Sequence, residues 1–131
     1  MSAQGKKTKK QVSTVHGPSL LTDHDIYLFK EGSHFSLYDK LGAHPLVHKG
    51  VKGTLFAVWA PEAKQVSVIG EFNQWNKGSH HLSARWDGSG IWEGFVPGVG
   101  RGSVYKYFIR SRVRGHEAEK ADPFAFAAEV A

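Results

Sequence analysis

Apolar residues recur at two different spacings along this chain, and the spacing changes about a third of the way along. Within residues 19–45, Ile26 and Phe29 recur at helical spacing, Thr22 is suited to cap a helix at its start, and Pro45 is suited to end the segment. We therefore expect a short helical arm over residues 19–45. An arm this apolar would pack on its own chain or on a neighbouring domain.

From Val51 onward the apolar positions alternate with period two, in short runs separated by Gly and Pro turns. The expected strands cover about 54–60, 65–72, 82–86, 91–96 and 103–113. Short strands at this spacing are typical of a small antiparallel β-sandwich. The first strand is apolar on both faces, so we expect it to be covered on both sides. The fold class is therefore all-β, with residues 46–118 as the sandwich.

In the last expected strand, residues 103–113, the alternation of side chains distinguishes an inner face from an outer face. Tyr105 and Tyr107 should point into the core, which places Lys106 on the outer face together with Phe108. The other aromatic candidates lie within strands or at their ends and are expected to be core residues rather than ligand platforms: Trp59, Trp86 and Trp92.

Length and cysteine content narrow the class of protein. With 131 residues, the chain has room for one domain and a tail. It has no cysteine, which excludes disulfides and thiolate metal sites and fits a cytoplasmic location. No apolar run reaches the roughly 18 residues of a membrane span, so no membrane partner is expected.

The net charge of +5 would suggest a nucleic-acid partner if it were spread over the folded part. Four of these charges come from Lys6, Lys7, Lys9 and Lys10, and the rest of the chain carries only +1. Residues 1–18 therefore read as a disordered basic tail. We expect no nucleic-acid binding.

Neither the histidines nor the acids form a catalytic pattern. His44 and His48 are four residues apart, but Pro45 ends the expected helical segment between them, so the eight histidines show no i, i+4 pair within a helix; they also have no cysteine partner, which favours scattered surface histidines over a metal site. A glycosidase pair needs two carboxylates about 5–10 Å apart across a cleft. Glu62, Glu71, Asp87 and Glu93 fall on turns or outward strand positions. We expect no catalytic residue, metal or cofactor in this chain.

The loop after the second strand is the best site candidate. Trp75 stands there among Asn73, Gln74 and Asn76. An aromatic ring can cover the C–H face of a pyranose while amides pair with its hydroxyls. Lys106 adds three donors that suit the same hydroxyls. The alternatives are that Trp75 folds back as a lid on the core and that Lys106 is an ordinary solvated strand residue.

Several sequence motifs, taken in their order along the chain, resemble those of one known family. They are LYDKLGAHP, GTLFAVWAPEAKQVSVIGEFNQWN, GIWEGFVPG, GSVYKYFI and KADPFAF. Together they resemble the amino-terminal region of bacterial α-1,4-glucan branching enzymes. The middle part alone is similar to the glycogen-binding, isoamylase-type amino-terminal domain, which debranching enzymes and the β subunit of an energy-sensing kinase also contain.

The resemblance implies an immunoglobulin-like β-sandwich, with residues 119–131 as an exit linker to a catalytic (β/α)₈ barrel outside this chain. In such enzymes the barrel cuts an α-1,4-glucan and rejoins the piece through an α-1,6 bond, by way of a covalent intermediate. The implied partners are α-1,4-glucan and that barrel. The apolar Phe124 and Phe126 of the linker fit this reading.

Sugar binding in the kinase-type relatives uses a Trp in an FN-x-W loop, a Lys after a Tyr on a late strand, and a second Trp soon afterwards. Trp75 and Lys106 match the first two, whereas His116 and Glu117 stand where the second Trp would be. The resemblance therefore implies weak glucan binding, or a domain that mainly packs on the barrel. A stand-alone glucan-binding module and the amino-terminal domain of a debranching or trehalose-releasing relative remain alternatives.

Overall fold

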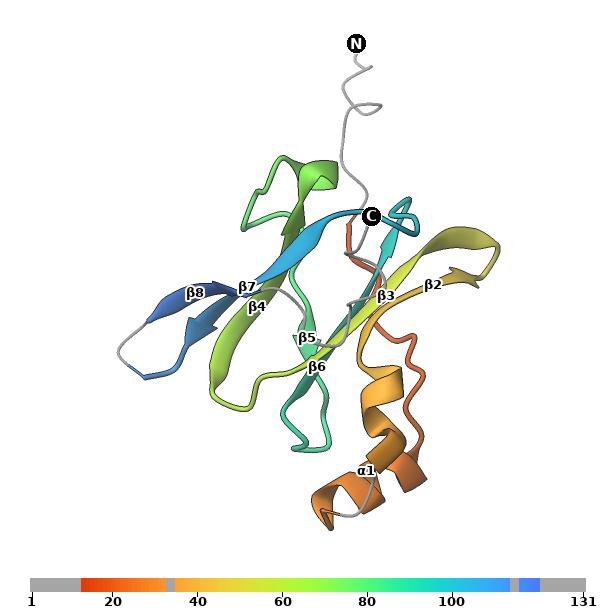
Figure 1. Cartoon of the computed structure of the whole chain (residues 1–131), viewed down its shortest axis with the longest axis vertical. Helices are drawn as coiled ribbons and strands as arrows, with labels where there is room; N and C mark the ends of the chain where they lie inside the picture. The colour runs from red at the N-terminus through yellow and green to blue at the C-terminus, as the bar shows by residue number, and fades with distance from the viewer. Residues whose placement is uncertain (1–12, 33–34, 114–115, 121–131) are drawn as a thin grey trace.

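The computed structural model describes residues 13–32, 35–113 and 116–120, which form two facing antiparallel sheets and a short helical arm (Figure 1). The first sheet has the order β2-β3-β6-β5; its strands are β2 (Gly42–His48), β3 (Val51–Trp59), β6 (Ile91–Pro97) and β5 (Ser83–Ala84). The second has the order β4-β7-β8; its strands are β4 (Ala63–Gly70), β7 (Tyr105–Ser111) and β8 (Glu117–Lys120). The predicted all-β sandwich is confirmed.

The prediction of a helical arm is right for two segments and wrong at its end. The helix α1 (Asp23–Lys30) and the 3₁₀-helix η2 (Phe35–Lys40) both form. Residues 42–45, however, begin strand β2, which pairs with β3 along its whole length. Pro45 suits this place because β2 is an edge strand, where a missing backbone N–H leaves no neighbour without a partner.

The start of α1 is fixed by a capping box. The backbone N–H of Asp25 donates to Oγ1 of Thr22 at 3.1 Å, and the backbone N–H of Thr22 donates to Oδ2 of Asp25 at 2.8 Å. Two N–H groups that the first helical turn leaves without partners are thereby satisfied. Lys40 reaches the same carboxylate from η2 at 2.7 Å, so the two helical segments are also tied to each other.

The arm packs on the outer face of the first sheet. A separate buried cluster joins it to β3 and β6, and its members are Leu21, Ile26, Leu37, Leu41, Ala57 and Ile91. Ala57 faces this cluster whereas its neighbours Phe56 and Val58 face the space between the sheets. Strand β3 is therefore covered on both sides, as its apolar pattern predicts, and the arm packs on its own chain.

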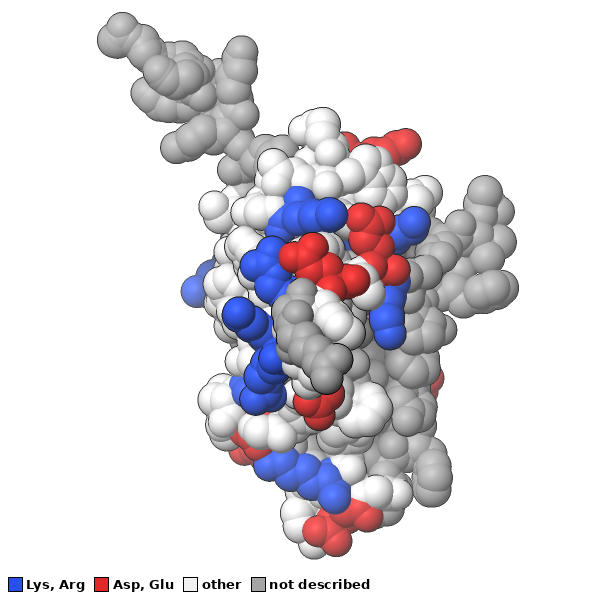
Figure 2. Space-filling model, turned by 90° about the vertical axis from the view of Figure 1, so that its left-hand side faces the viewer, with Lys and Arg blue, Asp and Glu red and all other residues white. Residues whose placement is uncertain are grey.

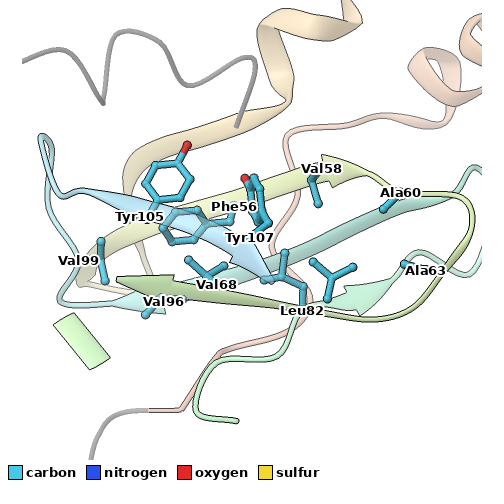
Figure 3. Close-up of a cluster of buried hydrophobic side chains, with 11 residues drawn as sticks. Phe56, Val58, Ala60, Ala63, Val68, Leu82, Val96, Val99, Tyr105 and Tyr107 are labelled. Atoms are coloured by element: carbon cyan, nitrogen blue, oxygen red, sulfur yellow. The ribbon is translucent and has the colours of Figure 1, made fainter. Parts of the chain in front are cut away.

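The main core lies between the two sheets (Figure 3). Its centre is Phe56, whose ring meets that of Tyr105 at a centroid distance of 5.0 Å and that of Tyr107 at 6.4 Å, both edge-on. Tyr105 and Tyr107 thus point inward, as predicted. The other buried members are Val58, Ala60, Ala63, Val66, Val68, Leu82, Val96 and Val99.

The predicted disordered tail is ordered in its described part. The backbones of Val15 and Phe95 exchange two hydrogen bonds, of 2.7 and 2.9 Å. Strand β5 pairs only with Trp92 and Glu93, so the backbone at Phe95 has an open side that Val15 fills. Residues 1–12, which carry the lysine cluster, lie outside the described residues.

Two expected core tryptophans are on the surface. Trp59 is 51% exposed and Trp86 is 81% exposed, whereas Trp92 is half-buried against the main core. The indole of Trp59 lies edge-on to Phe29 of the arm at 5.9 Å and donates to the backbone oxygen of Ser89 at 3.2 Å. Strand alternation therefore places Trp59 on the arm side of the sheet, beyond the edge of the buried cluster.

Candidate functional site

The loop that carries Trp75 leaves the end of β4 through the 3₁₀-turn η3 (Glu71–Asn73). Gln74 and Trp75 both have left-handed backbones, with φ of 53° and 59°. Each such residue other than glycine costs roughly 1–2 kcal/mol, so the conformation persists only where the surroundings impose it. Here the backbone N–H of Trp75 donates to the oxygen of Gly70 at 2.8 Å.

Asn73 holds this loop from beneath. Its side chain is completely buried. Its Oδ1 accepts from the N–H of Gly70 at 3.0 Å, and its Nδ2 donates to the oxygen of Val68 at 3.0 Å and to Nδ1 of His80 at 2.9 Å. The expectation that Asn73 contacts a sugar does not fit this geometry. Asn side chains often bond the nearby backbone in turns, which is the signal for a positioning role.

The two adjacent histidines have different environments. His80 is buried, with its ring 5.4 Å from that of Phe72. His81 is exposed, and its Nδ1 lies 3.0 Å from Nε2 of Gln65 and 3.0 Å from Oγ of Ser67. The expectation of surface histidines is therefore wrong for His80, which belongs to the support of the loop.

Trp75 itself is 38% exposed, so part of its indole faces solvent. Gln74 and Asn76 beside it are exposed, and Oδ1 of Asn76 accepts from the N–H of Gly78 at 2.8 Å. The loop thus presents an aromatic surface between two amide side chains, on a backbone that hydrogen bonds hold in place.

Lys106 lies next to the strand end from which this loop leaves. It pairs with Ile69 across the β4–β7 ladder, and the following pair is Gly70 with Tyr105. Because its neighbours point into the core, Lys106 points to the outer face, where it is exposed, as predicted. The structure therefore brings the backbones of Trp75 and Lys106 to one end of the second sheet (Figure 1).

Phe108 shares this outer face but is only 2% exposed. The ammonium of Lys77 lies 4.7 Å from the centre of its ring, and the guanidinium carbon of Arg110 lies 5.9 Å away. Lys77 also forms an ion pair with Glu119 of β8 at 3.6 Å. Sequence reasoning missed Lys77, which ties the Trp75 loop to the sheet and covers an outward-facing ring.

Charges of both signs alternate over this side of the molecule. Figure 2, which looks from the side where β8 lies in Figure 1, shows basic and acidic side chains next to each other. Arg110 pairs with Glu117 at 2.9 Å, beside the Lys77–Glu119 pair. The outer face therefore has mixed charge around its few exposed donors, an arrangement compatible with a neutral polar ligand.

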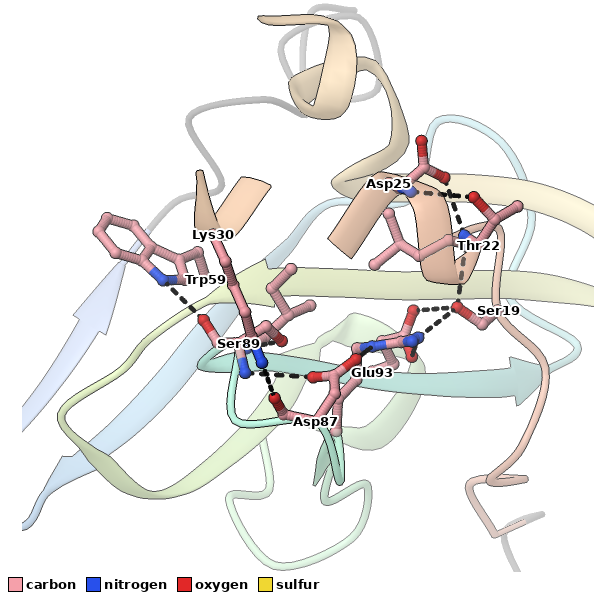
Figure 4. A network of polar contacts seen from close by, with 11 residues as sticks. Ser19, Thr22, Asp25, Lys30, Trp59, Asp87, Ser89 and Glu93 are labelled. Carbon is pink, nitrogen blue, oxygen red and sulfur yellow. Dashed lines mark hydrogen bonds and ion pairs between the residues drawn. The ribbon is translucent and has the colours of Figure 1, made fainter. Parts of the chain in front are cut away.

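A second polar cluster lies around Arg85, which stands at the turn between β5 and β6; Figure 4 shows its partners Ser19, Asp87 and Glu93. Its guanidinium donates to Asp87 at 2.8 Å, to Glu93 at 3.0 Å and to the hydroxyl of Ser19 at 2.8 Å. That hydroxyl in turn donates to Glu93 at 2.6 Å. Two of the acids considered for a glycosidase pair thus come together, but each is an ion-pair partner of Arg85.

The cluster shifts two pKa values. Burial by itself would raise the pKa of Asp87, but hydrogen bonds from Ser89 and Arg85 outweigh it and hold that pKa below its ordinary value. Burial opposes the charge of Arg85, yet Asp87 and Glu93 raise its pKa overall. Both groups are therefore held in their charged forms, as expected for a structural ion pair.

The described part of the chain offers little else in the way of sites. Among these residues, no three His, Cys, Asp or Glu side chains are grouped so that they could hold a metal ion. No helix among them combines the length and apolar character that crossing a bilayer requires.

Residues 40–125 match the sequence model of carbohydrate-binding module 48, the isoamylase N-terminal domain. This match covers more than half of the chain and includes both Trp75 and Lys106. The chain belongs to this family. The matched stretch begins just before β2 and ends five residues after β8.

The module is also similar to part of several branching enzymes. It is 55% identical over 111 residues to the 1,4-alpha-glucan branching enzyme GlgB of Aquifex aeolicus, a match that covers 85% of this chain and 17% of the relative. It is 57% identical over 118 residues to GlgB of Aromatoleum aromaticum, covering 90% and 18%. For GlgB of Gloeobacter violaceus the identity is 51% over 112 residues, covering 86% and 15%. The chain thus spans about a sixth of these curated relatives.

His116 and Glu117, which stand where the kinase-type relatives have a second Trp, lie away from the Trp75 loop. His116 bonds through its backbone oxygen to the N–H of Ser111, at 2.7 Å, and Glu117 begins β8. Both stand at the end of β7 opposite to Lys106. In this module the described surface near Trp75 therefore offers one exposed ring rather than two.

Proposed function

We propose that this chain is the amino-terminal, non-catalytic module of a cytoplasmic 1,4-α-glucan branching enzyme and that it holds α-1,4-glucan at the surface formed by Trp75, Asn76 and Lys106. The sheet arrangement would then be the immunoglobulin-like sandwich of this class of domain. Membership of a carbohydrate-binding family and the similarity to branching enzymes support the proposal. Similarity to branching enzymes favours it over a debranching or trehalose-releasing parent.

The observation that carries the glucan site is the conformation of the Trp75 loop. Two consecutive left-handed residues hold a partly exposed indole in place, and hydrogen bonds within the loop offset the cost of that backbone conformation. The buried Asn73 fixes that loop, and Lys106 stands beside the strand end from which it leaves. A ring held ready in this way can stack on a sugar without further loss of conformational entropy.

Titration with maltoheptaose tests the site directly. We expect the indole N–H resonance of Trp75 to shift at millimolar sugar, and the substitution Trp75→Ala to weaken binding about tenfold or more, if stacking contributes the 1–3 kcal/mol known for nucleobases. Lys106→Met should weaken binding to a smaller extent, since it removes donors but keeps the apolar stem.

Trp86→Ala is the matched control, because Trp86 is also an exposed tryptophan but lies beside the Arg85 cluster. It should leave the affinity unchanged. Equal losses from both substitutions, or no resonance shift at millimolar sugar, would remove the glucan site from this loop.

A second candidate function, packing on a catalytic barrel, rests on a different part of the surface. Tyr27, Trp59 and Trp86 are 61%, 51% and 81% exposed. Lys30 of α1 bonds to the backbone of Asp87 and Trp59 bonds to that of Ser89, so the three segments that carry these residues meet at the turn between β5 and β6. Exposed aromatic groups of this kind mark contact surfaces.

The two functions predict different outcomes in a full-length branching enzyme. If the surface of Tyr27, Trp59 and Trp86 packs on a barrel, the double substitution Tyr27→Ala and Trp86→Ala should lower the thermal midpoint of the full-length enzyme. It should leave the thermal midpoint of the isolated module unchanged. If the module only holds glucan, both proteins should respond alike. Formation of new α-1,6 branch points measures the activity of the parent in each case.

A further inference from the structure

Among the described residues, the main core of the module is open at one edge. A groove of about 570 Å³ lies there between the turn from β3 to β4 and the strands β7 and β8. Its walls include Trp59 and Pro61 on one side and Tyr107, Ile109, Ala118 and Lys120 on the other.

This groove continues the core rather than indenting an outer surface. Val58, Ala60 and Tyr107 line it and also belong to the buried cluster between the sheets. Ile109 pairs with Ala118 across the β7–β8 ladder, so the two side chains share the inner face, yet Ile109 is only half-buried and Ala118 is exposed. Nothing among the described residues covers this inner face of β8, so an apolar segment is needed to complete the core.

The chain itself supplies such a segment next to the groove. Lys120 lines the groove and is the last described residue, and eleven residues follow it with the sequence ADPFAFAAEVA. An extended chain of that length reaches about 35 Å. Phe124 and Phe126 are two positions apart, so both rings would lie on one side of an extended segment, with alanines on the other.

The extent of the family match points the same way. It runs to residue 125 and so includes Phe124, five residues beyond the end of β8. The stretch that defines the module therefore includes part of the segment after the last strand, which a mere linker would not require.

We propose that residues 121–127 turn back onto their own sandwich and place Phe124 and Phe126 in the groove between Trp59 and Ile109. The segment would then close the core of the module instead of serving as a free linker. This inference does not depend on glucan binding, because it concerns the opposite end of β7 from Lys106.

A spin label gives a sharp test, because the chain has no cysteine of its own. A nitroxide on Ala127→Cys, at an alanine position beside the two rings, should broaden the methyl resonances of Ile109 and the indole resonance of Trp59. Val47, 59% exposed on the edge strand β2, should stay sharp. The matched control carries the same label together with Phe124→Ser and Phe126→Ser, and the selective broadening should be lost.

Three results would overturn the proposal. The first is no selective broadening, or equal broadening in the control with both phenylalanines replaced. The second is broadening in a mixture of two kinds of chain, one carrying the spin label without isotopes and the other carrying isotopes without the spin label. That result would assign the groove to a second copy. The third is broadening that disappears on saturation with maltoheptaose, which would assign the groove to glucan. Loss of sugar binding at Trp75 alone would leave the proposal standing.

Discussion

Asn73 and His80 are joined by a buried hydrogen bond beneath the loop that carries Trp75, with Nδ2 of Asn73 2.9 Å from Nδ1 of His80. The N–H of Gly70 donates to the other end of the same amide, which fixes its orientation and makes Nδ1 of His80 the acceptor. The two residues therefore close the base of the loop formed by residues 74–79, and the loop that carries the exposed ring is held by a buried side chain.

Replacing Asn73 with alanine should lower the free energy of unfolding by about 2–4 kcal/mol. It removes three hydrogen bonds and leaves the buried N–H of Gly70 without its partner. Urea unfolding measures this loss, and Asn76→Ala, on the exposed part of the same loop, should change stability by less than about 1 kcal/mol. Equal losses for both substitutions would contradict a supporting role specific to Asn73.

The left-handed backbone at Gln74 predicts a stabilising substitution. Gln74→Gly should raise the free energy of unfolding by about 0.5–1 kcal/mol, because glycine adopts a φ of 53° without steric cost. Asn76→Gly is the control in the same loop. Asn76 is not among the positive-φ residues, so this change should lower stability instead. Thermal unfolding of both variants decides the sign.

Two glycine-to-alanine substitutions should differ in their effect on stability, because one glycine is closely packed and the other lies on an open surface. A Cβ at Gly53 would lie 2.5 Å from the backbone oxygen of Val96 and 2.8 Å from Cα of Pro97. Since backbone atoms cannot move aside cheaply, Gly53→Ala should destabilise the sandwich by about 1–3 kcal/mol. At Gly100 no other described residue comes within 4 Å of such an atom, so Gly100→Ala should be neutral or slightly stabilising. Urea midpoints measure both.

The ion pair between Arg85 and Asp87 predicts a pH dependence of stability. The pKa of Asp87 is lowered in the folded state from an ordinary value of 3.8, so its carboxylate stabilises the fold above that value. This contribution is lost as the pH falls through the folded pKa. The stability advantage of the wild type over Asp87→Asn should therefore shrink as the pH falls from about 5 to 3.

Urea unfolding at pH 7, 5, 4 and 3 follows that difference. Glu62→Gln is the control, because Glu62 is an exposed acid with no ion pair among the described residues. Its difference from the wild type should stay small throughout. A constant gap between Asp87→Asn and the wild type would show that the carboxylate charge does not stabilise the fold.

How far the sequence predicts the fold depends on how many apolar residues each strand contains. β3 is predicted by a run of apolar residues that covers both of its faces, and β7 by Tyr105, Tyr107 and Ile109, which share one face. The sequence does not predict β8, because all four of its residues are exposed and three of them are charged, which is equally typical of a loop. β2 was missed because Gly42 and Pro45 suit a helix end equally well, and only pairing with β3 makes them strand residues.

For the candidate site, the sequence indicated Trp75 and Lys106 by residue type and spacing. It gave no means to separate Asn73 from Asn76, since both are amides next to the same tryptophan. Burial separates them: Asn73 is enclosed while Asn76 is exposed. The role of Lys77 also depends on contacts, because it acts on Phe108 and Glu119, which come from other strands.

The sequence alone determined the class of fold, the inward direction of Tyr105 and Tyr107 and the family resemblance, because alternation and turn residues act between near neighbours in the chain. Only the tertiary structure decided that Trp59 and Trp86 are exposed, that Asn73 is buried beneath the loop, and that the described residues leave a groove beside Ile109. These properties depend on which distant segment covers a side chain. That choice is made when the two sheets pack, since each side chain is buried or exposed by its neighbours in space.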